Sequence, residues 1–283
     1  MILIENAPLA LSRRPVGESP PQRQLLRLVS ARTAGTYPRA RDLDFELRFR
    51  DATIDAARAL NASGAGFEVF ETSRCNGMFW IREPSGAFRL RPDRRPSEAI
   101  RDIFVNGPLY GFECATAIVI VFYKAALDTI GEEAYNRLFA DTYLYHWNVD
   151  RDLGLTTIRT YRFVPGDCLY FANPDVDPNK MQWQGENVIY FGGDTYYGHG
   201  IGIRSAREII DALNRNRRPG ARRSAYLMRQ ATRPNYVMLS QSAAAAPGFR
   251  GIIPAVDLRV APPYRAQVGR RLYLFEEDTV ETP

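Results

Sequence analysis

Residues 110–131 read YGFECATAIVIVFYKAALDTIG. Between Cys114 and Ile130 the side chains are apolar nearly all the way round a helical projection, and Gly131 is a typical helix end. The uninterrupted apolar run before Lys124 covers about ten residues, whereas a membrane span needs roughly 18. The stretch therefore predicts a helix over residues 114–130 that is buried in the core of a globular domain.

The chain after this helix consists mainly of strand patterns. Ser205 and Glu208 form a capping box that predicts one further helix to about Asn216. Apolar runs bounded by turn residues predict strands at 142–147, 159–164, 168–171, 186–191 and 195–199, and a strand or helical piece at 224–231. Because the strands follow the helix and do not alternate with helices, their order indicates an α+β fold.

The chain before the central helix mixes strand and helix patterns. Residues 43–49 alternate between apolar and polar side chains as in a strand, and residues 51–61 have helical spacing. Ser97 predicts the start of a short helix that ends at Asn106. Turn residues predict two hairpins, with Asn76-Gly77 between strands 67–71 and 78–82, and Pro84-Ser85-Gly86 before a strand at 87–90.

Composition divides the chain into three parts. Residues 1–40 are rich in proline and arginine without steady periodicity, so we predict an N-terminal arm. Residues 41–232 hold the patterns described above and form the predicted main domain. Residues 233–283, with an alanine run and several prolines, form a predicted C-terminal appendage with a few weak strands.

Arginine supplies almost all of the positive charge. The 283 residues include 37 lysines and arginines against 32 aspartates and glutamates, which gives a net charge of +5. Only Lys124 and Lys180 are lysines, so the other 35 are arginines, as a GC-rich genome would produce. A hydrophobic content of 45% excludes a disordered chain, and the scarcity of lysine excludes a lysine-rich tail. We predict no nucleic-acid partner and no membrane partner.

The start of the chain and its cysteines predict a cytoplasmic protein. Glu5 and Pro8 interrupt the apolar residues at the N-terminus, so no signal peptide is expected. The three cysteines are Cys75, Cys114 and Cys168. They have neither disulfide nor zinc spacing, so free thiols in a reducing compartment are predicted.

Cys114 is the strongest candidate for chemistry. A thiol is a nucleophile only as thiolate, and the backbone N–H groups and dipole of a helix N-terminus stabilise that form. Cys114 is the first residue of the predicted central helix, whereas Cys75 and Cys168 have no activating neighbour in the sequence. The alternative is that Cys114 is a small buried hydrophobe.

A cysteine nucleophile needs a base, and the sequence offers three candidates. Glu113 precedes Cys114, although its interaction with the helix dipole is enough to explain it. If Gly192-Gly193 is a two-residue hairpin loop, Glu186 faces His199 directly across the hairpin. A three-residue loop would shift this register by one, and an ion pair within the hairpin is the alternative interpretation of the two side chains.

Two further patterns are interpreted as structural. His146 lies in the aromatic run 143–147, which predicts a histidine satisfied within the core. Residues 175–186 resemble a calcium-binding loop, but Lys180 stands where the loop needs glycine and no helices flank the segment. We therefore predict no metal site and no other cofactor.

Three motifs carry a resemblance to a known family. They are YGFECATAIV at residues 110–119, GDCLYF at 166–171 and QWQGENVI at 182–189. With them the chain closely resembles the calcium-independent protein-glutamine γ-glutamyltransferases, or transglutaminases, of the bacterial spore coat. The resemblance covers residues 43–232 and implies a papain-like, NlpC/P60-related α+β fold, in which a catalytic cysteine opens a central buried helix packed on an antiparallel sheet.

The resemblance also implies roles for single residues. It matches Cys114 to the nucleophile, Glu186 to its partner carboxylate, Glu113 to the carboxylate beside the cysteine, and His199 to a histidine near the site. Cys114 would then form a thioester with a protein glutamine, and a lysine amine would convert it to an isopeptide bond. Because water would hydrolyse the thioester, we expect an apolar tunnel around it. The side chains expected to line that tunnel, if they do not simply fill the core, are Phe67, Trp147 and Trp183.

The implied partners are proteins that present glutamine and lysine side chains, coat proteins above all. The implied setting is spore coat assembly by a monomeric cytoplasmic enzyme that itself joins the coat. Two alternatives stay open. A cysteine amidase or peptidase of the NlpC/P60 class would release new amino termini from an open cleft, and a non-catalytic coat component would hold Cys114 buried and inert toward iodoacetamide.

The scarcity of lysine acquires a second interpretation from this chemistry. An enzyme whose thioester is discharged by lysine amines would cross-link itself if its own surface carried many of them. Genome composition predicts the same count, so the two interpretations separate only at Lys124 and Lys180. Protection requires both amines to be out of reach of the thioester.

Overall fold

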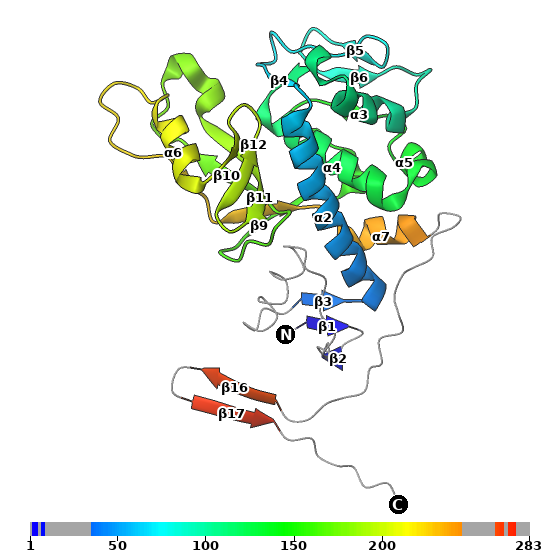
Figure 1. Cartoon of the computed structure of the whole chain (residues 1–283), viewed down its shortest axis with the longest axis vertical. Coiled ribbons are helices and arrows are strands. Elements are labelled where there is room, and N and C mark those ends of the chain that lie inside the picture. Colours follow the sequence, from blue (N-terminus) through cyan, green and yellow to red (C-terminus); the bar gives the residue numbers. More distant parts are fainter. Residues whose placement is uncertain (1, 5–6, 9–34, 245–263, 269–270, 276–283) are drawn as a thin grey trace, which may run out of the picture.

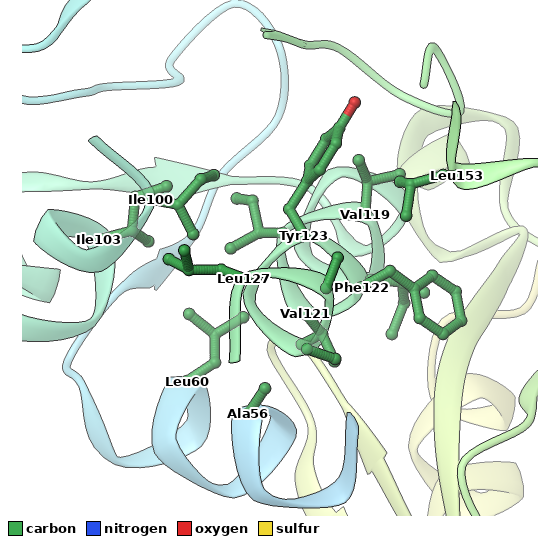
Figure 2. Packing of buried hydrophobic residues seen from close by; sticks show 14 of the residues in the cluster. Ala56, Leu60, Ile100, Ile103, Val119, Val121, Phe122, Tyr123, Leu127 and Leu153 are labelled. Atoms are coloured by element: carbon green, nitrogen blue, oxygen red, sulfur yellow. The ribbon is translucent and has the colours of Figure 1, made fainter. Parts of the chain in front are cut away.

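Helix α4 (Cys114–Ile130) runs through the centre of the computed structural model, which describes residues 2–4, 7–8, 35–244, 264–268 and 271–275. Fourteen of its 17 residues are buried, and Gly131, at φ 85°, ends it. The predicted boundaries of this helix are confirmed. Figure 2 shows Val121 and Phe122 on one part of its surface and Tyr123 and Leu127 on others, all packed against neighbouring elements.

Helix α2 (Ala40–Ala62) is one continuous helix of 23 residues that lies alongside α4 (Figure 1). The strand predicted for residues 43–49 is therefore wrong. Its buried residues, such as Phe45, Phe49, Thr53, Ala56 and Leu60, recur every three or four positions, which is the helical period. The apolar-polar alternation within 43–49 also fits this longer helical pattern. Burial of the apolar side chains against α4 makes the segment helical.

Three further helices pack around α4. They are α3 (Pro96–Val105), α5 (Glu132–Leu138) and α7 (Tyr236–Ala244). Pro96 is the first residue of α3, so Arg95, and not the predicted Ser97, is the N-cap of that helix. Tyr236 and Leu239 of α7 are buried in the same apolar cluster as α2 and α4. Residues after position 232 thus contribute to the core.

The main sheet has seven strands, all paired antiparallel. Its order is β13-β12-β11-β10-β15-β9, with β14 also paired to β10. The bounds are β9 (Thr156–Arg159), β10 (Cys168–Ala172), β11 (Gly185–Gly192), β12 (Thr195–Gly198), β13 (Gly202–Arg204), β14 (Tyr226–Leu227) and β15 (Gln230–Arg233). The strand predicted at 159–164 instead lies at 156–159, as β9. This helix-on-sheet arrangement is the predicted α+β fold class.

Side chains alternate between the two faces of this sheet. Cys168 and Ile189 belong to the cluster around α4, whereas Leu169 and Val188 pack with Ile209 on the other face. Ile209 comes from α6 (Ala206–Asn214), which begins at the predicted capping box and lies across the sheet from α2 and α4 (Figure 1). The predicted strand period and the predicted cap are confirmed here.

The β11–β12 hairpin has a different register from the predicted one. Tyr190 pairs with Tyr196 and Gly192 with Thr195, and an irregularity lies between the two pairs. Asp194 adopts a positive φ of 59°, so the loop is not the simple two-residue turn at Gly192-Gly193. The register is shifted by one residue, as in the alternative that the sequence left open, so Glu186 does not pair directly with His199.

Two small sheets lie before and beside α4. β4 (Gly66–Phe67) pairs in parallel with β7 (Gly111–Phe112), and β6 (Phe88–Leu90) pairs with β5 (Trp80–Arg82) and β8 (Tyr143–Leu144). The hairpin predicted at Asn76-Gly77 does not form. The first predicted strand, at 67–71, is shortened to β4 and pairs with the distant β7, whereas residues 80–82 of the second pair with β6. The second turn is confirmed by the hydrogen bond from the Gly86 N–H to the Glu83 carbonyl.

The remaining described elements are short. They are β1 (Ile2–Ile4), β2 (Ala7–Pro8), β3 (Gly35–Tyr37), β16 (Tyr264–Val268), β17 (Arg271–Phe275), and the 3-10 helices η1 (Gly107–Leu109), η2 (Arg151–Leu153) and η3 (Pro178–Trp183). Most of the predicted N-terminal arm, including Glu5, lies outside the described residues. Within the described residues, no helix has the length and apolar character needed to cross a membrane.

Candidate active site

Cys114 is the first residue of α4, and Glu113 is the N-cap of that helix. The Glu113 carboxylate accepts hydrogen bonds from the backbone N–H groups of Ala115 and Thr116, both at 2.7 Å, and from the Thr116 hydroxyl at 2.8 Å. Sequence predicted this position for Cys114. The parallel pairing of β7 with β4 delivers the chain to the same point, and it sets Phe67 beside Phe112.

The Cys114 thiol is nearly enclosed, with 8% of the residue exposed. Burial raises the pKa of the thiol, and the nearby Glu186 and Glu113 carboxylates raise it further. Asn187 opposes this trend, because its backbone N–H lowers the pKa and its side-chain Nδ2 donates to Sγ at 3.5 Å. A hydrogen-bond donor for the thiolate is therefore in place. To form that thiolate, the thiol must first give its proton to a neighbouring group.

Glu186, on β11, is fully buried, and neither of its carboxyl oxygens has a hydrogen-bond partner. Burial raises the pKa of this carboxyl, and the Glu113 charge raises it further. The backbone of His199 lowers the pKa in part, although it is not placed to form a hydrogen bond with either oxygen. Gly198 makes room for it, since a Cβ at that position would lie 2.9 Å from Glu186 Oε1. An unpaired buried carboxyl is costly and is found mainly where chemistry requires it.

His199 is held as a neutral, structural ring. Its Nε2–H donates to the Gly66 carbonyl at 3.0 Å, so Nδ1 is free to accept from the Tyr197 hydroxyl at 3.1 Å. The ring also stacks on Phe112, with centroids 4.8 Å apart. Burial lowers the pKa of His199 to about 4. Both ring nitrogens are thus occupied, and His199 fixes β12 against β4 and β7.

A cavity of about 880 Å³ opens beside the thiol. Its wall includes Cys114, Asn187, Phe67 and Trp147, two of which are predicted lining aromatics. The third predicted aromatic, Trp183, does not line this cavity. It stacks on Phe67 at 5.4 Å and faces a separate cavity of about 530 Å³. Glu186 and His199 lie behind the wall and not in it.

Two residues of the site carry no role in the sequence analysis. Asn187 follows Glu186, and strand alternation alone was enough to show that the two side chains point in opposite directions. His146, predicted as a core histidine, is exposed on the cavity wall. It has a positive φ of 50°, and its backbone N–H donates to the Thr116 hydroxyl at 3.0 Å. No local pattern signals such a backbone conformation.

The other cysteines are less suited to nucleophilic chemistry. Burial raises the pKa of Cys75 to about 11, and burial together with Asp167 raises the pKa of Cys168. Cys168 shares the cavity wall with Cys114 but is the first residue of strand β10 and has no helix N-terminus beside it. Cys168 is therefore a natural control for experiments on Cys114.

Comparisons with known proteins agree on one family. The family model described as protein-glutamine gamma-glutamyltransferase matches residues 1–243. A protein-glutamine gamma-glutamyltransferase of Bacillus pumilus (strain SAFR-032) is 50% identical over 217 residues, which cover 77% of this chain and 88% of the relative. One from Bacillus subtilis (strain 168) is 49% identical over 197 residues, covering 70% and 80%.

A solved structure gives the same answer for the fold. It is a transglutaminase from Geobacillus stearothermophilus without its C-terminal extension, 55% identical, with a TM-score of 0.70. The match covers 72% of this chain and 98% of that chain. The papain-like fold expected from the motifs is consistent with this match. The chain belongs to the protein-glutamine gamma-glutamyltransferase family.

Proposed function

We propose that Cys114 is the nucleophile and Glu186 the proton carrier of this acyltransferase. The observation that supports the pair is a fully buried carboxyl without any hydrogen-bond partner, in electrostatic contact with a buried thiol at a helix N-terminus. Glu113 already accepts three hydrogen bonds, and His199 has both nitrogens occupied. Among the three candidate bases, Glu186 alone makes no hydrogen bond while its charge acts on the thiol.

The first half of the reaction forms the thioester. At rest one proton is shared between Cys114 and Glu186, because burial and mutual repulsion disfavour a charge on both. As Sγ attacks the γ-carboxamide carbon of a protein glutamine, that proton passes to Glu186. Glu186 then donates it to the departing amide nitrogen, the C–N bond breaks, and ammonia leaves. Asn187 holds the thiolate until the S–C bond forms.

The second half transfers the acyl group to lysine. A neutral ε-amine attacks the thioester carbon, the new C–N bond forms and the C–S bond breaks. Glu186, now a carboxylate, takes the proton from the attacking nitrogen and returns it to Sγ. The products are an ε-(γ-glutamyl)lysine isopeptide and the resting thiol. A carboxyl whose pKa is raised toward neutrality can serve in both directions.

The cavity is open and partly polar, and not the enclosed apolar tunnel expected from the resemblance, but one part of its wall could keep water from the thioester. Phe67, Trp147, Val149 and Leu155 supply apolar wall beside Cys114. In such surroundings the amine of a bound lysine competes with few water molecules, so isopeptide formation is favoured over hydrolysis to glutamate. We propose that Phe67 and Trp147 line the path of the substrate side chains.

The proposal extends to the substrates and their setting. Proteins that present glutamine and lysine follow from the reaction. The resemblance in the motifs at 110–119, 166–171 and 182–189 supports spore coat proteins as the substrates and a monomeric enzyme that assembles into the coat. Three free cysteines support a cytoplasmic location before that assembly. We propose that the main domain begins near residue 40, as expected, and extends past the expected limit at 232 through α7, since Tyr236 and Leu239 pack in its core.

Amine incorporation tests the reaction and its nucleophile together. The enzyme, a glutamine-rich acceptor protein and a fluorescent primary amine should give a covalently labelled protein and one ammonia per label. Cys114→Ala should abolish labelling, whereas Cys168→Ala, a change of the same size in the same cavity wall, should retain it. Labelling that survives Cys114→Ala contradicts the proposal. New amino termini without amine incorporation would instead indicate a peptidase.

A further inference from the structure

The two lysines of the chain have different surroundings. Lys124, on α4, forms an ion pair with Asp128, and its ammonium lies 5.7 Å from the Phe104 ring centroid. Its side chain is 21% exposed. Ten residues of helix, about 15 Å of axial rise, separate it from Cys114. An amine that is ion-paired, charged and largely covered is a poor acceptor for an acyl group.

Lys180 lies on an exposed turn beside the active site. It belongs to η3, where its φ of −133° and ψ of 42° interrupt the helical geometry. The next residues of the chain, Met181, Gln182 and Gln184, line the cavity that holds Cys114. Lys180 takes part in none of the salt bridges found among the described residues 35–244. The residue is exposed, so its amine is accessible to another molecule.

The Lys180 amine lies near a second cavity and not in the wall of the one that holds Cys114. Within the described part of the chain it donates a long hydrogen bond of 3.5 Å to Asn216 Oδ1. Asn216 lines the separate cavity next to Trp183, on the other side of the Phe67–Trp183 stack from Cys114. Discharge of a thioester within one molecule would require the Lys180 side chain to leave Asn216 and turn toward the other cavity. A thioester on a second molecule meets no such obstacle.

We propose that Lys180 is the acceptor through which one enzyme molecule is covalently attached, by the Cys114 thioester of another, to glutamine-bearing proteins. The inference rests on the proposed acyl transfer. The C–S bond of the thioester breaks, an amide bond forms between the acyl carbon and Lys180 Nζ, and the amine proton returns to the Cys114–Glu186 pair. The low lysine count then leaves a single attachment point on the described surface, and the protection predicted from composition holds for Lys124 only.

A two-component experiment tests this directly. Active Lys180→Arg enzyme is mixed with affinity-tagged Cys114→Ala enzyme, which has Lys180 but no nucleophile, and with a biotinylated glutamine peptide that has no lysine and a blocked N-terminus. Mass spectrometry should find the peptide on Lys180 of the tagged molecule. Adding Lys124→Arg to the tagged molecule should leave the label in place, and adding Lys180→Arg should remove it.

Two controls separate the inference from the reaction that it assumes. In the same mixture a small fluorescent amine should be incorporated into casein by the Lys180→Arg enzyme as well as by the wild type. If casein is labelled while the tagged molecule is not, or is labelled at Lys124 or only at its N-terminal amine, the assignment of Lys180 is overturned. If casein is not labelled either, the acyl transfer itself is refuted.

The wild-type enzyme provides a second readout that needs no inactive variant. The initial rate at which the peptide labels the enzyme itself should rise with the square of the enzyme concentration, because donor and acceptor are different molecules. Lys180→Arg should abolish this labelling. A first-order rate that is independent of dilution would show transfer within one molecule and would contradict the inferred transfer between molecules.

Discussion

Two carboxylates of the main sheet are equally buried and have opposite surroundings. Asp167 lies just before β10 and Glu186 lies on β11, and each has 0% of its surface exposed. Asp167 accepts hydrogen bonds from Arg50 at 2.8 Å, from Arg233 at 2.7 and 2.8 Å, and from the Val164 N–H at 2.9 Å. Glu186 accepts none. Sheet position and burial therefore do not distinguish them, but their partners do.

The contrast separates a structural carboxylate from a reactive one. Burial alone would raise the pKa of Asp167, but Arg50 and Arg233 overcome that effect and hold the pKa below its ordinary value. Burial raises the pKa of Glu186 and nothing of similar size opposes it. Asp167 ties α2 to the sheet through Arg50 and also pairs with Arg233 of β15, whereas Glu186 retains an affinity for a proton. Loss of the charge should thus damage stability at one position and activity at the other.

Glu186→Gln should cause the largest loss of activity among the variants that keep the thiol. The amide has nearly the same shape but carries no proton between Sγ and the substrate nitrogens, so kcat/KM for amine incorporation should fall about 10²- to 10⁴-fold. The melting temperature at pH 7 should stay the same or rise, because no charged form is any longer buried. Glu113→Gln is the matched control, and a larger loss of kcat/KM there would transfer the proton role to Glu113.

Asp167→Asn should reverse this pattern. The Arg50 guanidinium, 1% exposed, would keep its ion pair with Glu46 but lose the one with Asp167. Arg233 would lose its partner as well, so the free energy of unfolding should fall by about 3 kcal/mol. Urea denaturation measures this loss. The molecules that remain folded should retain kcat/KM, since Asp167 does not contact the cavity. A stable but inactive Asp167→Asn protein would contradict the division between the two carboxylates.

The sequence predicted the parts of the fold that local pattern controls. The limits of α4 and the capping box at Ser205 follow from periodicity and end residues, and both are confirmed. The conformation of residues 43–49 and the hairpin at Asn76-Gly77 depended on distant partners, α4 and β7, that no local window contains. In both places tertiary contact outweighed a short local signal.

The candidate site shows the same limit at finer scale. Cys114 and Glu113 could be placed from sequence because they are defined by one helix end. The relation of Glu186 to His199 depended on a one-residue register, and the loop around Asp194 shifts it. The position of Trp183 also depends on a contact between distant residues. Its ring stacks on Phe67, and it lines the second cavity instead of the one that holds Cys114. Neither property is encoded in residue spacing.

Asn187→Ala should weaken the thiolate without removing the proton carrier. A hydrogen bond to a charged group contributes about 1.5–3 kcal/mol, so the thiolate fraction should drop roughly tenfold or more. The rate of Cys114 alkylation by iodoacetamide at fixed pH, followed by mass spectrometry, measures it. Gln184→Ala removes an amide from the same cavity wall without touching Sγ and should leave the rate unchanged. Equal rates in wild type and Asn187→Ala would exclude the donor role.

Stability should depend on pH with opposite sign at the two carboxylates. Unfolded Glu titrates near 4.3, and the folded pKa of Glu186 is raised. Between these values only the folded state holds the proton, so stability falls as pH rises, by up to about 1.4 kcal/mol per pH unit. Asp167 has a lowered folded pKa, so its contribution is present above about pH 4 and is lost as pH falls.

Difference curves between each variant and the wild type isolate these contributions. The stability of Glu186→Gln relative to wild type should increase from about pH 4.5 upward until the pH passes the folded pKa of Glu186, and then level off. The deficit of Asp167→Asn relative to wild type should shrink as the pH falls below 4. Parallel curves for Glu186→Gln and wild type between pH 5 and 8 would contradict a raised pKa.

Trp147→Ala should have the smallest effect, on product choice and not on total turnover. Trp147 is half-buried in the cavity wall, and its removal admits water to the thioester without changing the Cys114–Glu186 pair. The ratio of glutamate to isopeptide product should rise a few-fold, about 1 kcal/mol of altered partitioning. Trp183→Ala opens only the separate cavity and should leave the ratio near that of the wild type. If both variants shift the ratio equally, water reaches the thioester through the Phe67–Trp183 stack, and the second cavity must be counted as part of the active site.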